Sequence, residues 1–133
     1  MKYFKYSVWI LGLLLLIGAA VIYLGEIKET KEPFMQGGQK FTLVGSVQVR
    51  FGKLSIGNGG VSISNYTDSS GTEHYGPSAN LFFHISDDDS KDQRHIVYAG
   101  WNAEIENYSI YVEGVEINRF IGQGRVHLRI WEN

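Results

Sequence analysis

Residues 108–131 read YSIYVEGVEINRFIGQGRVHLRIW, and this stretch decides the fold. Apolar and polar residues alternate along both of its halves, with Ile110 and Val112 in the first half and Val126 and Leu128 in the second. A period of two places successive side chains on opposite faces of an extended chain. Each half therefore predicts a β-strand with one buried face and one wetted face.

The same stretch carries its own turn and its own irregularity. The phase of the alternation shifts at Gly114, and Val115 and Ile117 then continue the apolar face, so we expect a β-bulge near this glycine. The GQG sequence at 122–124 separates the two halves and is typical of a tight turn. Two antiparallel strands joined by a short connection are the expected result.

The chain upstream repeats this pattern as far as residue 41. Residues 46–51 (SVQVRF) and 60–66 (GVSISNY) alternate, whereas 80–85 (NLFFHI) and 94–100 (RHIVYAG) are more continuously apolar and predict central strands. Turn signals lie between them, at GNGG (57–60), DSSG (68–71) and DDDSKD (87–92). We expect an all-β domain of about seven strands, an antiparallel β-sandwich that is immunoglobulin-like in the broad sense, with a small barrel as the alternative.

A different pattern occupies the N-terminus. Residues 8–24 contain no charged residue, and aromatic residues flank the run at both ends. The run approaches the length that a helix needs to cross the roughly 30 Å hydrocarbon core of a membrane. We therefore expect a transmembrane anchor helix at 8–25 after a short cytoplasmic N-terminus at 1–7, because Lys2 and Lys5 favour the inner side. The alternative is a signal peptide cleaved after GAA at 18–20.

The composition changes abruptly after the apolar run. Residues 26–40 (EIKETKEPFMQGGQK) combine alternating charges with Pro33 and a glycine pair, which is typical of a solvated tether, although a short helical extension of the anchor is equally consistent. The expected organisation is thus an anchor, a charged and Gly-containing linker at 26–40, and an extracytoplasmic domain at 41–133, either periplasmic or extracellular.

Bulk composition removes several classes of function. The 133 residues carry a formal net charge of -2, so no basic excess indicates a nucleic-acid partner. The sequence has no cysteine, which excludes disulfides, thiolate zinc sites and a cysteine nucleophile. The domain must therefore be stabilised by packing alone.

Candidate chemistry is sparse. The acidic residues of 87–92 offer oxygen ligands for calcium, but their spacing does not fit an EF-hand loop, and a solvated hairpin tip is expected instead. His84 and His95 would come near one another across that hairpin and could hold a metal with an aspartate, as in a metal-dependent hydrolase. The chain has no Gly-x-Ser-x-Gly nucleophile motif. We predict no catalytic residue, no metal site and no cofactor.

Exposed aromatic residues are the stronger signal. Residues 66–78 are expected to form a long loop that concentrates Tyr66, His74 and Tyr75, and Trp101 lies beside a strand. Aromatic side chains next to small polar residues are typical of recognition surfaces, although many aromatics in small β-domains fill the core. These four residues form the predicted binding surface.

The function expected from these features is non-enzymatic. A membrane-anchored extracytoplasmic β-domain would bind a partner protein or serve as an accessory subunit of a membrane assembly, since anchoring raises the effective concentration of a weak binder. The alternative is a secreted ligand- or glycan-binding protein released by cleavage, and the third hypothesis is the metal-dependent hydrolase. The expected partners are the membrane and a protein, and no nucleic acid.

Overall fold

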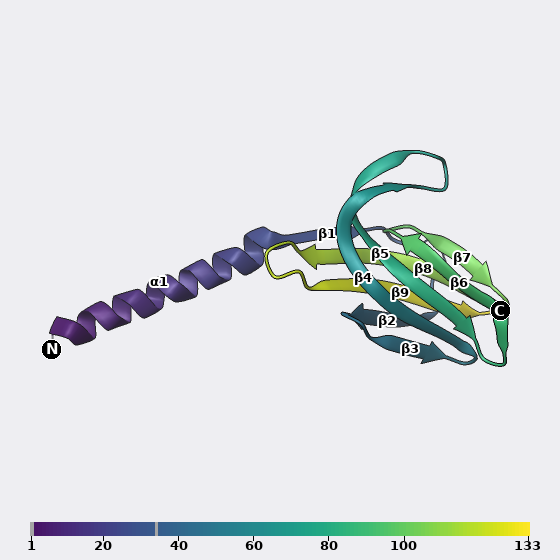
Figure 1. Cartoon of the computed structure of the whole chain (residues 1–133), viewed down its shortest axis with the longest axis horizontal. Coiled ribbons are helices and arrows are strands. Elements are labelled where there is room, and N and C mark those ends of the chain that lie inside the picture. The colour runs from purple at the N-terminus through teal and green to yellow at the C-terminus, as the bar shows by residue number, and fades with distance from the viewer. Residues whose placement is uncertain (1, 34) are drawn as a thin grey trace.

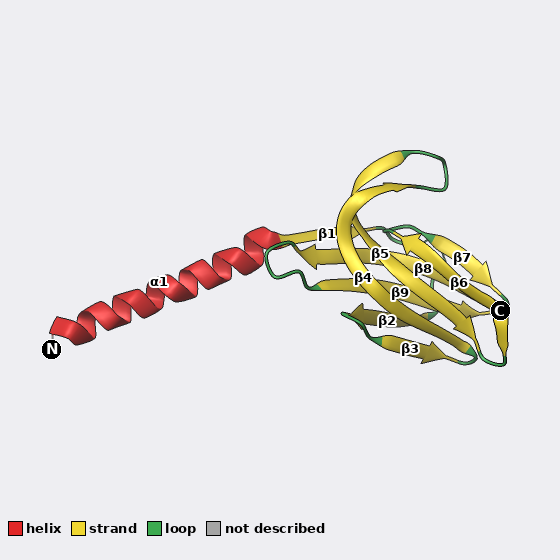
Figure 2. Cartoon of the chain, in the orientation of Figure 1, coloured by secondary structure: helices red, strands yellow, loops and turns green. Residues whose placement is uncertain are grey.

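The computed structural model describes residues 2–33 and 35–133, which form one helix and nine strands (Figures 1 and 2). In chain order they are α1 (Lys2–Gly25), β1 (Glu26–Thr30), β2 (Gln39–Val44), β3 (Gln48–Phe51), β4 (Leu54–Thr67), β5 (Glu73–Ile85), β6 (Asp88–Val97), β7 (Asn102–Ile105), β8 (Tyr108–Asn118) and β9 (Gly124–Glu132). The prediction of a mostly β chain behind an N-terminal helix is confirmed, with more strands than the seven expected.

The helix α1 projects away from the strands (Figure 1). Its 21-residue segment Lys5–Gly25 is long and apolar enough to cross a membrane. Its large apolar side chains from Val8 to Leu24 are exposed, so the helix is not part of the core of the domain. The apolar run starts at Val8, but the helix already begins at Lys2, six residues earlier. No helix-breaking residue lies between these two positions.

The strands form two antiparallel sheets. One contains β1, β8, β9 and β2 in that order, with β7 also paired to β8, and the other follows the order β3-β4-β5-β6. The stretch that decided the fold supplies β8 and β9, which pair from Tyr108↔Glu132 to Ile117↔Gly124. The register shifts between Val112 and Gly114, which confirms the predicted bulge.

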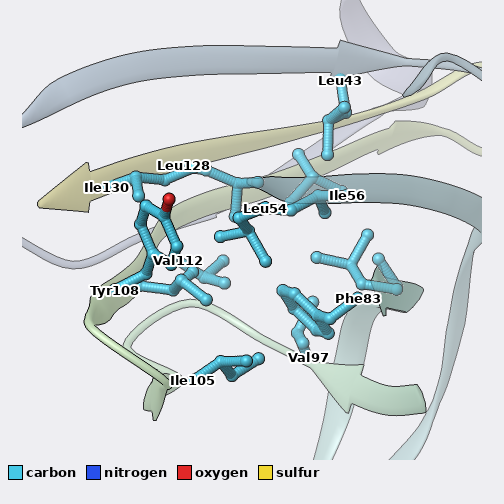
Figure 3. Close-up of a cluster of buried hydrophobic side chains, with 14 of the residues drawn as sticks. Leu43, Leu54, Ile56, Phe83, Val97, Ile105, Tyr108, Val112, Leu128 and Ile130 are labelled. Carbon is cyan, nitrogen blue, oxygen red and sulfur yellow. The ribbon is translucent and has the colours of Figure 1, made fainter. Parts of the chain in front are cut away.

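Both sheets contribute to one hydrophobic core (Figure 3). Leu43, Val112 and Leu128 come from the first sheet, and Leu54 and Phe83 come from the second. Each of these side chains is at most 1% exposed. The alternation of apolar residues identified the buried face of β8 and β9 correctly, whereas Val47, which it placed on the buried face at 46–51, is exposed.

The segment predicted as a solvated linker at 26–40 contains strand β1 at its start and the first residues of β2 at its end. Glu26–Thr30 is strand β1, which pairs with β8 from Glu26↔Asn118 to Thr30↔Gly114. Farther along, the indole Nε1 of Trp131 donates a hydrogen bond to the carbonyl of Gln36 over 3.1 Å. The prediction of a tether from the alternating charges is wrong at 26–30, because charged side chains also alternate with less polar ones in a strand that has one face towards solvent. Neither a free tether nor a helical extension is present at 26–30.

The GNGG sequence at 57–60 is a β-bulge inside β4 and not the predicted turn. The pairing of β4 with β5 is interrupted between Asn58 and Val61, and Oδ1 of Asn58 accepts a hydrogen bond from the amide of Gly60 at 2.9 Å. Gly60 has a φ of 133°, a conformation that favours glycine. The glycines therefore bend a strand where a turn was expected to end it.

Because β4 continues through the bulge, β4 and β5 form a long hairpin that extends beyond their neighbours in the sheet (Figure 1). We call residues 61–78 the hairpin arm and its turn, Asp68–Thr72, the arm tip. The predicted long loop at 66–78 is wrong, since only the arm tip lies outside the strands. The DSSG turn prediction is confirmed.

The hairpin predicted around the acidic segment 87–92 is present, with residues 86–87 joining β5 to β6. The connection is tighter than expected, however, because β5 ends at Ile85 and β6 begins at Asp88. Asp87 adopts a φ of 70° in this turn. Most of the acidic residues therefore lie on strand β6 instead of in a loop.

Candidate functional site

The arm tip is organised around the carboxylate of Asp68. Its Oδ1 accepts hydrogen bonds from the amides of Ser70 and Thr72, each over 2.9 Å, and from the Ser70 hydroxyl over 2.6 Å. Its Oδ2 lies 2.7 Å from Nε2 of His74. An aspartate that precedes a tight turn commonly binds the following amides in this way. The carboxylate thus fixes both the turn and the imidazole.

These hydrogen bonds keep the carboxylate charged. The Ser70 hydroxyl, followed by His74 and the backbone amide of Thr72, lowers the pKa of Asp68 far below its ordinary value. Each partner stabilises the ionised form and none of them stabilises the protonated form. The arm tip therefore presents a permanent negative charge at neutral pH.

Three aromatic rings stack beneath the arm tip. The ring of Tyr66 lies 4.8 Å from that of Tyr98 and 5.3 Å from that of His74, and the planes are 11° and 20° from parallel. Tyr66 and His74 are directly opposite each other on β4 and β5, while Tyr98 follows β6. The stack therefore joins the arm to the far edge of the same sheet.

A contact with the first sheet completes the stack. The Tyr66 hydroxyl donates a hydrogen bond to Oε2 of Glu29 on β1, over 3.2 Å. Burial of the phenol, with the nearby negative charge of Glu29 as the next cause, raises the pKa of Tyr66 to about 12. The tyrosine is consequently a neutral hydrogen-bond donor that ties the arm to β1.

Two hollows adjoin the stack. One, of about 420 Å³, lies against β1 and is lined by Lys28, Lys31, Tyr66 and His74 among others. The other, of about 240 Å³, lies towards the β6–β7 connection, with Trp101 in its wall. Asp68 and Tyr98 line both hollows, so the two form one continuous surface around the arm tip.

The four residues predicted to form the binding surface do not all lie on one face of the molecule. Tyr66 and His74 are in direct contact, and Trp101 reaches the second hollow while its ring also stacks on the core residue Phe83 at 5.7 Å. Tyr75 pairs with Asn65, one position along from the Tyr66 and His74 pair, so it points to the opposite face of the arm. Tyr75 is 71% exposed and lines neither hollow.

Sequence reasoning missed three contributors to this surface. Asp68 was part of a predicted turn but had no assigned role, although an aspartate at the first position of DSSG is a known signal for hydrogen bonds to the following amides. Tyr98 lay in a segment predicted as a central strand. Glu29 lay in the predicted linker, and no local pattern indicates that β1 would pass beneath the arm.

The two histidines considered for a metal site lie on opposite faces of the sheet. The Nδ1 atom of His84 lies 2.5 Å from Oδ1 of Asp92, whereas His95 packs on the inner side, 5.2 Å from the ring of Trp101. In the part of the chain that the structure describes, one group of candidate ligands comes together, His84 with Asp89 and Asp92, within 4.8 Å. Both aspartates of this group are exposed, and Asp92 raises the pKa of His84 through its hydrogen bond.

A second charged cluster has a structural explanation. Glu116 is 7% exposed on β8, and Lys28, Arg125 and His127 lie 3.6, 3.8 and 3.4 Å from its carboxylate oxygens. A buried carboxylate requires such compensation. These contacts bind neighbouring strands of one sheet to each other, so the cluster belongs to the scaffold.

Comparison with protein-family models, with curated proteins and with solved structures finds no match. The function must therefore be inferred from the geometry of the chain itself. The surface around the arm tip combines stacked aromatic rings, a fixed negative charge and two lysines beside a pair of hollows. This combination suits the binding of a ligand that has both apolar and charged groups.

Proposed function

We propose that this protein is a non-enzymatic, membrane-anchored module that binds a partner protein through the arm tip, within an immunoglobulin-like β-sandwich in the broad sense. The observation that carries the proposal is the continuous surface formed by Tyr98, Asp68 and His74 between two hollows. Helix α1 would hold the domain in the membrane, with Lys2 and Lys5 on the cytoplasmic side. The β-domain would then be periplasmic or extracellular.

Binding is favoured over catalysis by the orientation of the polar groups. Among the hydrogen bonds of the described residues, the Ser70 hydroxyl donates to Asp68, and the His74 imidazole contacts the other oxygen of the same carboxylate, so the histidine is not placed to activate the serine as a nucleophile. The carboxylate of Asp68 is fully engaged in holding the turn. The Asp68 and His74 pair therefore acts as a rigid support for the surface.

A protein partner is favoured by the edges of the arm. β3 pairs with β4 only as far as Gly57, and β6 pairs with β5 only as far as Ala79, so the arm strands 61–67 and 73–78 pair only with each other in the described sheets. The outer edge of strand 61–67, whose residues are exposed or half-buried, presents backbone donors and acceptors to which an extended segment of another chain can add, whereas Gly76, Pro77 and Ser78 on the other strand are buried. The neighbouring hollows would receive the side chains of that segment.

The test is site-specific photo-crosslinking of the full chain in its native membrane. A photoreactive residue at Ser69, which lines the second hollow, should yield a defined protein adduct. The double variant His74→Ala with Tyr98→Ala should lose this adduct, because it removes two walls of the surface. The matched control Tyr75→Ala changes an exposed aromatic on the opposite face and should retain the adduct.

The outcomes separate clearly. An adduct that persists in the double variant, or one that Tyr75→Ala weakens equally, contradicts the assignment of the surface. Absence of any protein adduct at Ser69 contradicts the protein-binding function. Near-identical circular dichroism spectra of the three variants would establish that loss of the adduct reflects the surface and not unfolding.

A further inference from the structure

The turn between β8 and β9 lies against the end of helix α1 (Figure 1). The side-chain amide of Asn118 donates a hydrogen bond to the carbonyl of Ile22 over 3.0 Å, and the amide of Arg119 donates to the carbonyl of Gly25 over 2.9 Å. The last four carbonyls of a helix have no partner within the helix. The turn supplies partners for two of them and is thereby fixed to the end of α1.

Packing at this junction is close. A Cβ atom at Gly25 would lie 2.5 Å from Cδ2 of Phe120 and would also collide with the side chain of Asn118. Gly25 is buried although it ends a helix whose other described side chains are largely exposed. The domain therefore follows the helix without an intervening flexible segment, since β1 begins at the next residue, Glu26.

The turn presents two large apolar side chains to solvent. Phe120 is 60% exposed and Ile121 is 56% exposed. Oδ1 of Asn118 accepts hydrogen bonds from both of their amides, at 3.0 and 3.2 Å, so the backbone of the turn is held in one conformation. Tight turns usually carry polar residues, and exposed apolar side chains beside an apolar helix indicate an apolar environment.

The position of the turn identifies that environment. The 21-residue apolar segment of α1 ends at Gly25, and at 1.5 Å per residue it matches the roughly 30 Å thickness of the hydrocarbon core. The end of the helix, and with it the turn, then lies at the boundary between lipid and water. The guanidinium of Arg119, 5.4 Å from the centre of the Phe120 ring, suits that boundary, where arginine reaches lipid headgroups and aromatic rings are enriched.

We propose that the β8–β9 turn, residues 119–122, inserts into the interface of the bilayer that α1 spans and holds the β-domain against the membrane in one orientation. The proposal rests on the membrane anchoring proposed above. Its occupant is the lipid interface, because the apolar surface of the turn is continuous with that of the helix end.

The test uses the full chain in lipid vesicles, with a single cysteine introduced at chosen positions and labelled with an environment-sensitive fluorophore. Because the natural sequence has no cysteine, each label is unique. The label is placed at Gln123, a polar position beside the turn, so that the probe does not replace an apolar residue that drives insertion. Reference labels at Leu16 in the helix and at Ser69 in the arm tip mark the bilayer interior and the aqueous phase.

Lipids brominated near the headgroup should quench most of the fluorescence at Gln123 and leave Ser69 unchanged, while lipids brominated near the chain ends should quench Leu16. The double variant Phe120→Ser with Ile121→Ser should abolish quenching at Gln123 and leave quenching at Leu16 intact. The insertion of the turn is overturned if the label at Gln123 is quenched no more than the label at Ser69 when the turn is unchanged. It is also overturned if the quenching at Gln123 persists in the double variant. Loss of quenching at Leu16 overturns the anchor itself and therefore the proposed function, so the two failures are distinguishable.

Discussion

At the scale of single residues, the carboxylate of Asp68 takes part in four hydrogen bonds in and beside the arm tip. One carboxylate closes the arm tip, positions His74 and supplies the negative charge of the proposed binding surface. A side chain with this many local partners replaces backbone hydrogen bonds that a tight turn leaves unmade. The arm tip should therefore respond to any change at this position.

The pH dependence of the arm tip follows from the lowered pKa of Asp68. A carboxyl whose pKa is lowered by folding stabilises the folded form at pH values above its ordinary value of 3.8, and this contribution is lost as the pH falls below that value. We expect the amide chemical shifts of Ser70 and Thr72 to stay constant from neutral pH to about pH 4 and to change together only in stronger acid. A common transition at or above the ordinary value would contradict the hydrogen-bond network, and Asp68→Asn should abolish the transition.

The link between Tyr66 and Glu29 makes a second prediction at this scale. Tyr66→Phe keeps the stacked ring and removes one hydrogen bond, so it should lower the free energy of unfolding by about 1 kcal/mol. It should also remove from the ultraviolet titration a phenol with a pKa of about 12. Folding raises this pKa, so the stabilisation is present below the ordinary value of 10.0 and is lost as the pH rises towards 12. Tyr75→Phe, at an exposed ring, should change neither quantity.

At the scale of the elements, the bulge in β4 lies at the base of the hairpin arm. The two strands of the arm leave the sheet after the bulge and curl above the rest of the domain (Figure 1). Tyr66, on the bent arm, contacts Glu29 of β1. Bulges increase the twist of a strand locally, which is the physical origin of the bend.

The bulge can be tested with a matched pair of glycine variants in β4. Gly60→Ala places a side chain at a φ of 133° and should destabilise the domain by about 1–3 kcal/mol. Gly57→Ala lies in the same strand, at an ordinary φ and with no atom within 4 Å of the new Cβ, so it should change stability by less than about 0.5 kcal/mol. Urea unfolding of the full chain in detergent micelles, followed by tryptophan fluorescence, gives both values. Equal effects of the two variants would show that the backbone conformation at Gly60 is unimportant.

The same elements show how far the sequence alone leads. Strict alternation in residues 108–131 predicted two strands, their buried faces and the bulge at Gly114, because burial of one face leaves a period of two in the sequence. The glycines at 57–60 did not identify the local structure, because the sequence GNGG is compatible with a bulge as well as with a turn. Strand β1 was missed because it depends on pairing with β8, more than eighty residues away in the sequence, which no local pattern encodes. Tyr66 and His74 lie in one local segment and were predicted as binding residues. Their partners Tyr98 and Glu29 are far away in the sequence, so they were not.

At the scale of the whole molecule, the chain has two parts with opposite surfaces. Helix α1 exposes its apolar side chains from Val8 to Leu24, whereas the β-domain buries an apolar core between its two sheets and leaves fewer large apolar side chains exposed, among them Phe120 and Ile121. Such a division fits a protein that lies partly in lipid and partly in water. The sequence made this division plain, because the apolar run at 8–24 has no polar face.

The orientation of the chain in the membrane can be measured with single cysteines. An impermeant maleimide added to intact cells should label Ser69→Cys, and it should label Tyr3→Cys only after the membrane is opened. Tyr3 is chosen because its replacement leaves Lys2 and Lys5, which favour the inner side, unchanged. The mature protein should also retain its first residues in the membrane fraction. A soluble form that begins at Val21 would instead support cleavage after Ala20.

The direct passage from α1 into β1 has a mechanical consequence. A force that pulls the domain away from its helix acts along the axis of β1, because Glu26 follows Gly25 without slack. The pairs from Glu26↔Asn118 to Thr30↔Gly114 then carry the load together, in shear, instead of opening one after another like a zip. The junction between α1 and β1 is therefore expected to resist such a force more strongly than a strand pair that is loaded from one end.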